Sequence, residues 1–365
     1  MKQYFYLLNI LMLMVFGAKA QDIHFSQYYA MPLTLNPALT GKFDGFYRVN
    51  AIYRGQYYGV TQSNSIFRTP GVSVDFSLLK EKMKGNALGV GLAFVNDQQT
   101  STGKLNTNTI YLSLAYTLNL GKKKATQISL GFTPSYTLRN VSGDYKFYDG
   151  FDKTTLEYTN TSGFESITIP KVNYFNLAAG LFFNTQPIKW MTFYAGYSMM
   201  NILRPNVAVI SKGNSDARLN FRHVAHAGFE FDVTKKWVLI PGFLYQNVAK
   251  ANEANVGLMV GYNFMNKPRN DGSGRSDKGT IFLGLWNRMG ADAVSAFAYR
   301  NLTPKIGLDY KNFRFGFAYD IDLGKFGSDA KAGNFKRPQA YEITLSYMGF
   351  LPQYRENRFL FNPRF

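Results

Sequence analysis

The chain has 365 residues, and its 41 Lys and Arg against 23 Asp and Glu give a formal net charge of +18, with no cysteine. The lack of cysteine excludes a disulfide framework, a thiolate metal site and a lipid anchor on an N-terminal cysteine. At this length a barrel can still be one closed domain, and 16% aromatic residues with 33 Gly suit long pleated strands.

Residues 1–20 are predicted to be a secretory signal peptide. Lys2 gives a positive start, residues 5–16 form an apolar core, and an Ala-Lys-Ala cleavage site ends at Ala20, before Gln21. This core is shorter than the ~20 residues that an α-helix needs to cross a bilayer. Export makes nucleic acid an unlikely partner of the basic charge, so we expect the lysine-rich turns to meet anionic lipid headgroups or an acidic partner.

Residues 21–45 are predicted to be a non-strand lead-in that lies in the periplasm or in the lumen of a barrel. Pro32 and Pro37 each remove a backbone donor and push the preceding residue toward extended or turn geometry. Asn36 can satisfy its own backbone, as Asn does in turns. The segment therefore has the character of an ordered, irregular piece that precedes the first strand.

Residues 46–349 are predicted to form an all-β structure, a transmembrane antiparallel β-barrel. Every second residue from Ile110 to Leu120 is apolar, which puts one face toward lipid and the other toward water. No stretch in this region is long and apolar enough for a helical span, so strands must do the crossing. The fourteen candidate strands lie near residues 46–54, 72–78, 87–95, 110–120, 126–138, 172–183, 190–201, 225–232, 237–248, 256–265, 280–288, 292–310, 313–322 and 340–348.

The predicted connections agree with an even strand count, short periplasmic turns and longer outer loops. With the N-terminus in the periplasm, turns fall at 80–86, 120–125, 184–189, 233–236 and 311–312, and outer loops at 55–71, 96–107, 139–171, 202–219 and 323–339. Two stretches fit badly. Residues 266–278 would be a long periplasmic turn, and Asn301 to Pro304 interrupts the strand at 292–310. Pro134 inside a strand pattern predicts a bulge or an unpaired position.

A soluble β-sandwich or propeller would also show alternation. Strands of soluble proteins average about five to six residues, whereas the predicted ones run to about ten or twelve. No internal repeat of fixed period is visible, which speaks against a propeller. We therefore expect a membrane barrel.

Three groups of residues resemble one known family. In the lead-in, Asp-x-His-Phe-Ser-Gln-Tyr is followed by Pro-Leu-x-Leu-Asn-Pro-Ala and a Gly. The second group is Tyr53-Arg54-x-Gln56, and the third covers residues 283–288, 310–316, 319–320 and 342–347. Together they resemble the PorP/SprF family, outer-membrane proteins of the type IX secretion system in Bacteroidetes. The likeness spans essentially the whole mature chain and departs from the family pattern through extra residues around 291–304.

The resemblance implies an outer-membrane barrel that supports secretion or surface attachment of cargo, typically large adhesins, some of which serve gliding. The implied partners are outer-membrane lipid, the type IX translocon or periplasmic components, and secreted adhesin-like cargo. The lead-in motif is either a plug that packs and seals the lumen or a partner contact, and the two roles are compatible. Its candidate residues are Asp22, His24, Phe25, Gln27, Tyr28, Pro32, Asn36, Pro37, Ala38 and Gly41.

Little in the sequence suits catalysis, and we predict no enzyme activity, no cofactor and no metal site. His223 and His226 face opposite sides of a strand and cannot form a metal pair, so hydrogen bonding in the lumen is expected for His226. No nucleophile elbow or phosphate-binding loop is present. Inward carboxyls could in principle pair as acid and base, but a role in hydrating the lumen is expected. They are Glu230, Asp232, Asp320 and Asp322.

Two other functions stay open. A FadL-like diffusion channel or hydrophobic-solute transporter would also have about fourteen strands and an N-terminal Asn-Pro-Ala hatch. A structural barrel tethered to peptidoglycan through a partner would depend on residues 350–365, a predicted C-terminal periplasmic tail with Arg among Phe. The outer loop at 139–171 is the expected surface contact or a lid.

Overall fold

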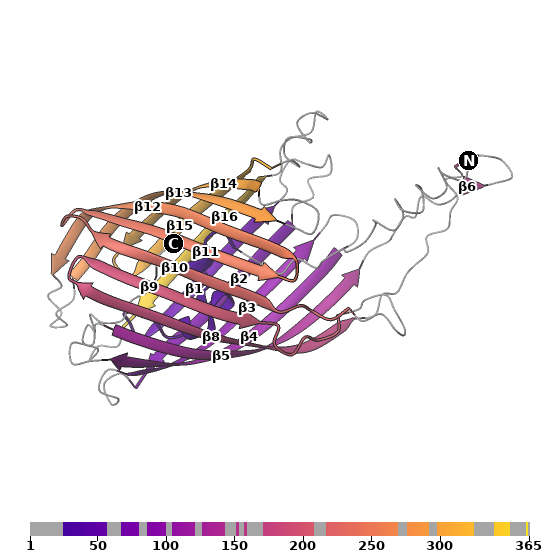
Figure 1. Cartoon of the computed structure of the whole chain (residues 1–365), viewed down its shortest axis with the longest axis horizontal. Helices are drawn as coiled ribbons and strands as arrows, with labels where there is room; N and C mark the ends of the chain where they lie inside the picture. The colour runs from indigo at the N-terminus through magenta and orange to yellow at the C-terminus, as the bar shows by residue number, and fades with distance from the viewer. Residues whose placement is uncertain are drawn as a thin grey trace.

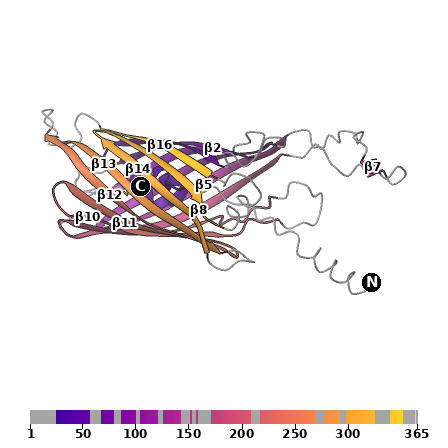
Figure 2. The same cartoon turned by 90° about the horizontal axis from the view of Figure 1, so that it is seen from above.

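The structure is a computed structural model that describes residues 25–56, 67–79, 86–99, 104–120, 126–142, 151–152, 157–158, 171–207, 217–268, 276–291, 298–324, 339–350 and 363. Fourteen of its strands form one closed antiparallel barrel, in the ring order β1-β16-β15-β14-β13-β12-β11-β10-β9-β8-β5-β4-β3-β2. Pairing of β1 with β16 closes the ring. The prediction of a fourteen-stranded barrel is confirmed, and Figures 1 and 2 show the strands tilted relative to its long axis.

Three short helical pieces precede the barrel, namely η1 (Tyr28–Ala30), α2 (Pro32–Leu35) and η2 (Pro37–Leu39). A separate two-stranded sheet pairs β6 (Phe151–Asp152) with β7 (Glu157–Tyr158). The barrel strands are β1 (Tyr47–Gln56), β2 (Phe67–Leu78), β3 (Ala87–Gln99), β4 (Lys104–Leu120), β5 (Thr126–Ser142), β8 (Val172–Ile188), β9 (Met191–Met200), β10 (Arg222–Asp232), β11 (Trp237–Val248), β12 (Ala251–Pro268), β13 (Ser276–Ala291), β14 (Ala298–Tyr310), β15 (Phe313–Asp322) and β16 (Gln339–Gly349).

The two faces of the wall differ as the alternation predicts. On β4, the apolar residues from Ile110 to Leu120 are between 36% and 48% exposed, whereas Ser113 and Thr117 between them are buried. On β15, Phe313, Phe315 and Phe317 point outward, and Asp320 is buried. Since the described ring has no free edge, every such strand offers one face to lipid and one to the lumen.

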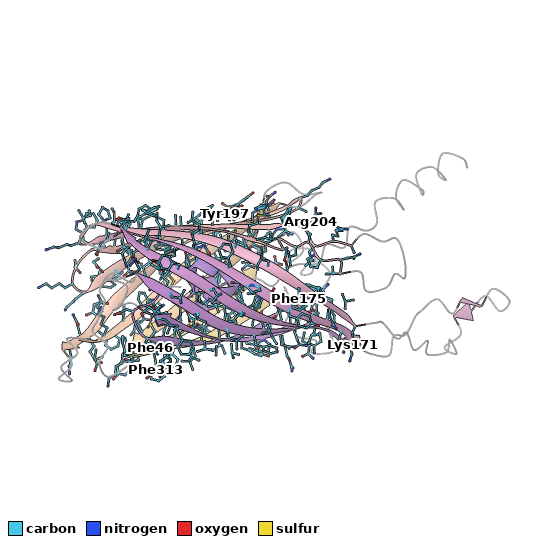
Figure 3. All side chains as sticks on the ribbon, turned by 90° about the horizontal axis from the view of Figure 1, so that it is seen from below. Phe46, Lys171, Phe175, Tyr197, Arg204 and Phe313 are labelled. Carbon is cyan, nitrogen blue, oxygen red and sulfur yellow. The ribbon has the colours of Figure 1, made fainter. Side chains whose placement is uncertain are left out.

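An aromatic belt surrounds one end of the barrel. A chain of ring contacts, with successive centroids 4.9–6.5 Å apart, joins Phe46, Phe76, Tyr47, Tyr347 and Phe313 in that order. Further round the ring, the ring centroids of Trp237 and Tyr262 are 5.0 Å apart. Figure 3 shows Phe46 and Phe313 at this end and Lys171 at the opposite end. Such rings prefer the lipid–water boundary, so the belt marks one membrane interface.

The belt lies at the end where the connections are 79–86, 121–125, 189–190, 233–236, 269–275 and 311–312, which we call the short-turn end. The opposite, loop end carries the connections 57–66, 100–103, 143–171, 201–221 and 323–338, together with the tighter ones at 249–250 and 292–297. No helix in the described parts of the chain is both long and apolar enough to span a membrane.

Several strands run further than the sequence pattern predicts. The predicted loop 96–107 is largely strand, because β3 continues to Gln99 and β4 begins at Lys104. At that end, Asn96 donates to Asn106 and Asn108 across the β3–β4 pair, at 2.5 and 2.8 Å. Once a strand leaves the apolar band both faces are polar, so alternation ends while backbone pairing continues. The predicted long turn at 266–278 shortens for the same reason, because β12 reaches Pro268 and β13 begins at Ser276.

The prediction for residues 292–310 is wrong in its details. The strand β14 begins at Ala298 and runs without a break through Asn301 to Pro304, while residues 292–297 lie outside the described part. A register shift opposite Met289 leaves Arg300 as the extra residue. The strand count is unaffected, because the irregularity is a bulge and not another hairpin.

Two prolines lie at positions where one of the two neighbouring ladders is interrupted, so their missing N–H removes no ladder hydrogen bond. Pro134 pairs with Leu177 of β8, while the ladder to β4 breaks after Tyr111–Ser135 and resumes in the same register at Leu114–Phe132. Pro134 is thus unpaired only toward β4 and is not a bulge. Pro304 repeats the arrangement, paired with Leu285 of β13 and skipped in the ladder to β15.

Candidate functional site

Residues 25–44, which we call the lumenal segment, lie inside the barrel. Ser26 and Gln27 bond to Glu342 on β16, whereas Asn36 bonds to the carbonyl of Leu181 on β8, across the ring. Residues from Phe25 to Phe43 are almost all buried. Because so short a chain cannot bury itself, its burial comes from the wall around it.

The inner wall has three sectors of different chemistry. The charged sector, on β1 and β13–β16, holds buried Arg54, Arg288, Lys305, Asp320 and Glu342. The hydroxyl sector, on β2–β5, holds buried Ser and Thr side chains: Ser73, Ser77, Thr109, Ser113, Thr117, Ser129, Thr133 and Thr137. The apolar sector, on β8–β13, holds Phe182, Tyr194, Val224, Val238, Ile240, Leu244, Met259, Phe282 and Trp286.

The charged sector forms hydrogen bonds with the start of the lumenal segment. The backbone N–H groups of Ser26 and Gln27 donate to the two oxygens of the Glu342 carboxylate, at 2.6 and 2.7 Å. The Ser26 hydroxyl contacts the Asp320 carboxylate at 2.7 Å, and the Ser26 carbonyl accepts from Lys305 at 2.6 Å. Every polar group of one residue is therefore held by a charged side chain, and charge-assisted bonds of this kind are the strong ones.

Arg54 lies at the centre of this network. Its guanidinium pairs with Glu342 and lies 3.0 Å from Asp320, with side-chain exposures of 3% or less. Arg288 donates to Ser26 at 2.8 Å, and the Lys305 ammonium lies 4.3 Å from the Trp286 ring centroid. Burying these charges is costly unless each is paired and bonded, so the lumenal segment completes a network that the strands alone leave open.

The middle of the lumenal segment packs on the apolar sector. Tyr28, Tyr29, Leu35, Ala38 and Leu39 belong to the same buried cluster as the wall residues. The Tyr28 ring meets Trp286 edge to face at 5.6 Å, and the Tyr29 ring meets Tyr194 in the same way at 5.9 Å. Edge-to-face contacts of this kind add a directional preference to simple burial.

His226 and Asn36 join the lumenal segment to β10. Asn36 Nδ2 lies 3.1 Å from His226 Nε2, and the Tyr29 hydroxyl lies 2.9 Å from His226 Nδ1. A neutral imidazole has one acceptor and one donor nitrogen. Because an amide nitrogen can only donate, Nε2 accepts and Nδ1–H donates to Tyr29. Asn36 Oδ1 accepts from the Ala38 N–H at 2.9 Å, the local bond expected for Asn in a turn.

The end of the lumenal segment fits the hydroxyl sector. Thr40 bonds to Ser113 at 2.6 Å, and the Lys42 ammonium donates to Gln127 at 2.8 Å. The Gly41 N–H donates to Asp75 at 2.8 Å, and Asp75 also accepts a two-pronged contact from Arg48. Gly41 has φ +68°, a left-handed conformation that favours glycine.

Glycines on the inner wall let the lumenal segment approach the strands. A Cβ at Gly131 would collide with the backbone of Pro37, and one at Gly89 would collide with the carbonyl of Thr40. Backbone atoms cannot rotate away as a side chain can, so these two strand positions require glycine. Gly89 and Gly91, at spacing two on β3, thus serve close packing.

Two cavities flank the lumenal segment. The first, toward the short-turn end, is lined by Gln27, Tyr29 and Ala30 together with Arg48, Asn50 and neighbouring residues of β15 and β16. The second, which we call the loop-end cavity, has Leu33 and Thr34 on one side and residues of β3, β4, β5, β8, β9 and β10 on the other. The segment therefore separates a cavity toward one end of the barrel from a cavity toward the other.

Eight of the ten predicted motif residues lie together in the lumenal segment. Phe25 packs in a second apolar cluster with Met31, Leu33, Ile52 and Val95. Pro32 and Pro37 each open a helical turn. Gln27 donates to the Glu342 carbonyl at 3.2 Å and accepts from Thr344 at 3.1 Å. Asp22 and His24 lie outside the described residues.

The wall partners of the motif were not predicted as site residues. Arg54, Arg288, Asp320 and Glu342 lie in the stretches that carry the family resemblance, and all four meet Ser26 or Gln27 or each other. The alternation of side chains along β1 could have predicted that Arg54 points inward, since it lies on the same face as Arg48 and Asn50. Their convergence on one residue could not be read from spacing.

One expectation about the lumen is wrong, and one feature of its wall was not predicted. Asp320 does not hydrate the lumen; it is 1% exposed and bonded to Ser26 and Thr303. The apolar sector was not foreseen, although residues 237–244 are nearly continuously apolar, which is typical of a strand buried on both faces. His223 and His226 do face opposite sides, and within the described residues no cluster of three His, Cys, Asp or Glu could hold a metal.

Comparison with known proteins gives a family and a fold. A family model described as "Type IX secretion system membrane protein PorP/SprF" matches residues 17–347. No curated protein matches the sequence. Among solved structures, a FadL homologue from Pseudomonas aeruginosa is similar over 88% of this chain and 93% of its own, with 10% identity and a TM-score of 0.52. A mutant of the TodX monoaromatic hydrocarbon channel is similar over 89% and 94%, with 10% identity and a TM-score of 0.50. At this identity the likeness concerns the fold alone.

Proposed function

The chain belongs to the PorP/SprF family of type IX secretion system membrane proteins, and from this premise we propose that it supports the secretion or surface attachment of cargo proteins at the outer membrane. The cargo class we propose is large adhesins, including those that serve gliding. In this proposal the barrel is a docking component with a sealed lumen and no enzymatic activity. Residues 1–20 are removed on export, and the mature chain begins at Gln21.

The family match carries the secretion role, and the fit of the lumenal segment to all three sectors of the wall supports a sealed lumen. Its polar start meets charges, its aromatic and aliphatic middle meets the apolar sector, and Thr40 and Lys42 meet the hydroxyl sector. A segment matched to its surroundings along its whole length acts as a plug. A plugged barrel does not conduct a folded or unfolded protein, so cargo is handled at the barrel's ends.

Each proposed partner is assigned to one surface of the barrel, namely its outer face, its short-turn end or its loop end. Outer-membrane lipid surrounds the exposed apolar face and its aromatic belt. By the rule that periplasmic turns are short, the short-turn end faces the periplasm and the type IX translocon or periplasmic components. Secreted cargo meets the loop end. The predicted loop 139–171, whose first residues 139–142 belong to β5, and the predicted tail 350–365 are the first segments to test.

The experiment is a pull-down of the epitope-tagged protein from detergent-solubilised envelopes, with co-purifying chains identified by mass spectrometry. Recovery of type IX components or of a large secreted protein supports the proposal. A tagged version that ends at residue 349 is the matched control for the tail, because it keeps every barrel strand. A barrel recovered alone, under conditions that hold a known type IX complex together, contradicts the proposal.

The alternative is a diffusion channel or hydrophobic-solute transporter, which the FadL-like fold and the apolar sector of the lumen favour. A transporter of this kind needs an apolar path past the lumenal segment, whereas Tyr28, Tyr29 and Leu39 fill the apolar sector. Uptake of a monoaromatic hydrocarbon by cells that carry the protein, and not by cells that lack it, would favour the alternative. Equal uptake in both strains would remove it.

A further inference from the structure

The loop-end cavity has a lining that the secretion role does not use. Leu33 and Thr34 of the lumenal segment form its inner boundary, and it opens toward the loop end between β3, β4, β5, β8 and the ends of β9 and β10. All of its lining residues belong to the described part of the chain.

Most of the side chains that line the cavity are polar and can donate or accept hydrogen bonds. Five Ser and Thr residues of β4 and β5 supply hydroxyls, and Asn176 and Asn201 add amides that bond to each other at 2.7 Å. A hydroxyl both donates and accepts, and it rotates to suit its partner. Ligand pockets for apolar solutes are lined chiefly by hydrophobic side chains, so this cavity suits a ligand that is rich in hydroxyls. The five hydroxyl residues are Thr107, Thr109, Thr133, Ser135 and Thr137.

The charged groups of the lining favour an acid. Arg139 and Arg222 line the cavity together with a single carboxylate, that of Asp97, which already accepts from Thr69 at 2.7 Å and from Gln99 at 2.9 Å. Arg222 also donates to the amide oxygen of Gln246 at 2.6 Å. Arg139 Nε is buried and has no hydrogen-bond partner among the described residues. A guanidinium matches a carboxylate with two parallel bonds, and a buried donor without a partner marks the place for one.

Two tyrosines complete the cavity. Tyr111 on β4 and Tyr174 on β8 line it, and a tyrosine offers an apolar ring face together with a polar tip. An apolar ring face suits the C–H face of a sugar ring, while hydroxyls and amides suit its edge. We propose that the loop-end cavity binds a sugar acid, a polyhydroxylated ring that carries one carboxylate, with Arg139 as the residue that recognises the carboxylate.

The test uses the purified full chain in detergent and titration calorimetry with three probes. Glucuronate carries both features, glucose carries the hydroxyls without the carboxylate, and glutamate carries carboxylates without the sugar ring. We expect glucuronate to bind at least tenfold more tightly than either of the others. The substitution Arg139→Gln keeps the size and polarity but removes the charge, and it should weaken glucuronate binding at least tenfold.

The matched control is Arg68→Gln, which makes the same change at an exposed position of β2 outside the cavity and should leave affinity within twofold. Equal thermal unfolding of both variants shows that loss of binding is not loss of fold. Equal binding of glucose would overturn the role of the carboxylate, and equal binding of glutamate would point instead to an acidic peptide. Absence of glucuronate binding up to about 10 mM overturns the site. None of these outcomes bears on the secretion role, which the pull-down tests separately.

Discussion

At the scale of single residues, the charged network around Ser26 depends most on Glu342. This carboxylate accepts both backbone N–H groups of Ser26 and Gln27 and pairs with Arg54. Removing one partner of a buried pair leaves the other charge uncompensated, whereas the network as a whole costs little when it is complete.

We expect Glu342→Gln to lower the free energy of unfolding by roughly 3–5 kcal/mol. The lumenal segment should loosen as well, which trypsin can report, because Lys42 is the one Lys or Arg in residues 25–44 and is 0% exposed. Urea titration and the rate of cleavage after Lys42 are the two measurements.

The control for this substitution is Asp309→Asn, which breaks a more exposed pair with Arg314 at the short-turn end. It should cost roughly 1 kcal/mol and leave Lys42 protected. Equal cleavage rates in the two variants would show that the network does not hold the lumenal segment.

Gly131 offers a purely steric test of the same packing. We expect Gly131→Ala to displace the lumenal segment, because the new Cβ would occupy the space of the Pro37 backbone. The barrel itself should fold, since an alanine is compatible with a strand. Cleavage after Lys42 should therefore rise while the far-ultraviolet circular dichroism stays that of the parent.

The matched change is Gly279→Ala, where the added Cβ meets the exposed ring of Phe264, which can turn aside. This variant should keep Lys42 protected. A protected Lys42 in Gly131→Ala would mean that the segment can shift within the lumen without leaving it.

At the scale of elements, each barrel strand has an outer face toward lipid and an inner face toward the lumen. On β4, Leu112 lies near the middle of the strand and Leu120 at its last position, both on the outer face. A charge at the bilayer midplane is expensive, and the cost falls toward the interface.

We expect Leu112→Lys to destabilise the barrel in liposomes by about 2–4 kcal/mol, and Leu120→Lys by about 0–1 kcal/mol. Equilibrium denaturation in lipid vesicles measures both. Equal costs at the two positions would mean that the apolar band does not centre on Leu112, and the membrane would have to be placed elsewhere on the barrel.

At the scale of the whole molecule, ring closure and lumen filling are separate properties. The fourteen strands close by backbone pairing between β1 and β16. A ring of this size encloses more space than its own side chains fill, unlike a small barrel of about eight strands.

Deletion of residues 25–44 should therefore give a folded but open barrel. The charged sector would then be hydrated instead of paired with Ser26. Single-channel recording in planar bilayers should show steady conductance for the deletion variant and almost none for the parent chain. A silent deletion variant that still unfolds cooperatively would show that the outer loops, and not the lumenal segment, close the pore.

The sequence by itself determined the barrel, because a two-residue period over about ten or more residues is longer than the strands of soluble proteins and fits strands with one face in lipid and one in the lumen. Residues 110–120 and 313–322 show this period most clearly, and their faces are as predicted. Strand ends were less predictable, since the period ends with the apolar band while backbone pairing goes on, as at Gln99 and Lys104. Only the tertiary structure decided the site. Ser26, Arg54, Arg288 and Glu342 are far apart in the chain, and no local rule specifies which strands the ring brings around one residue.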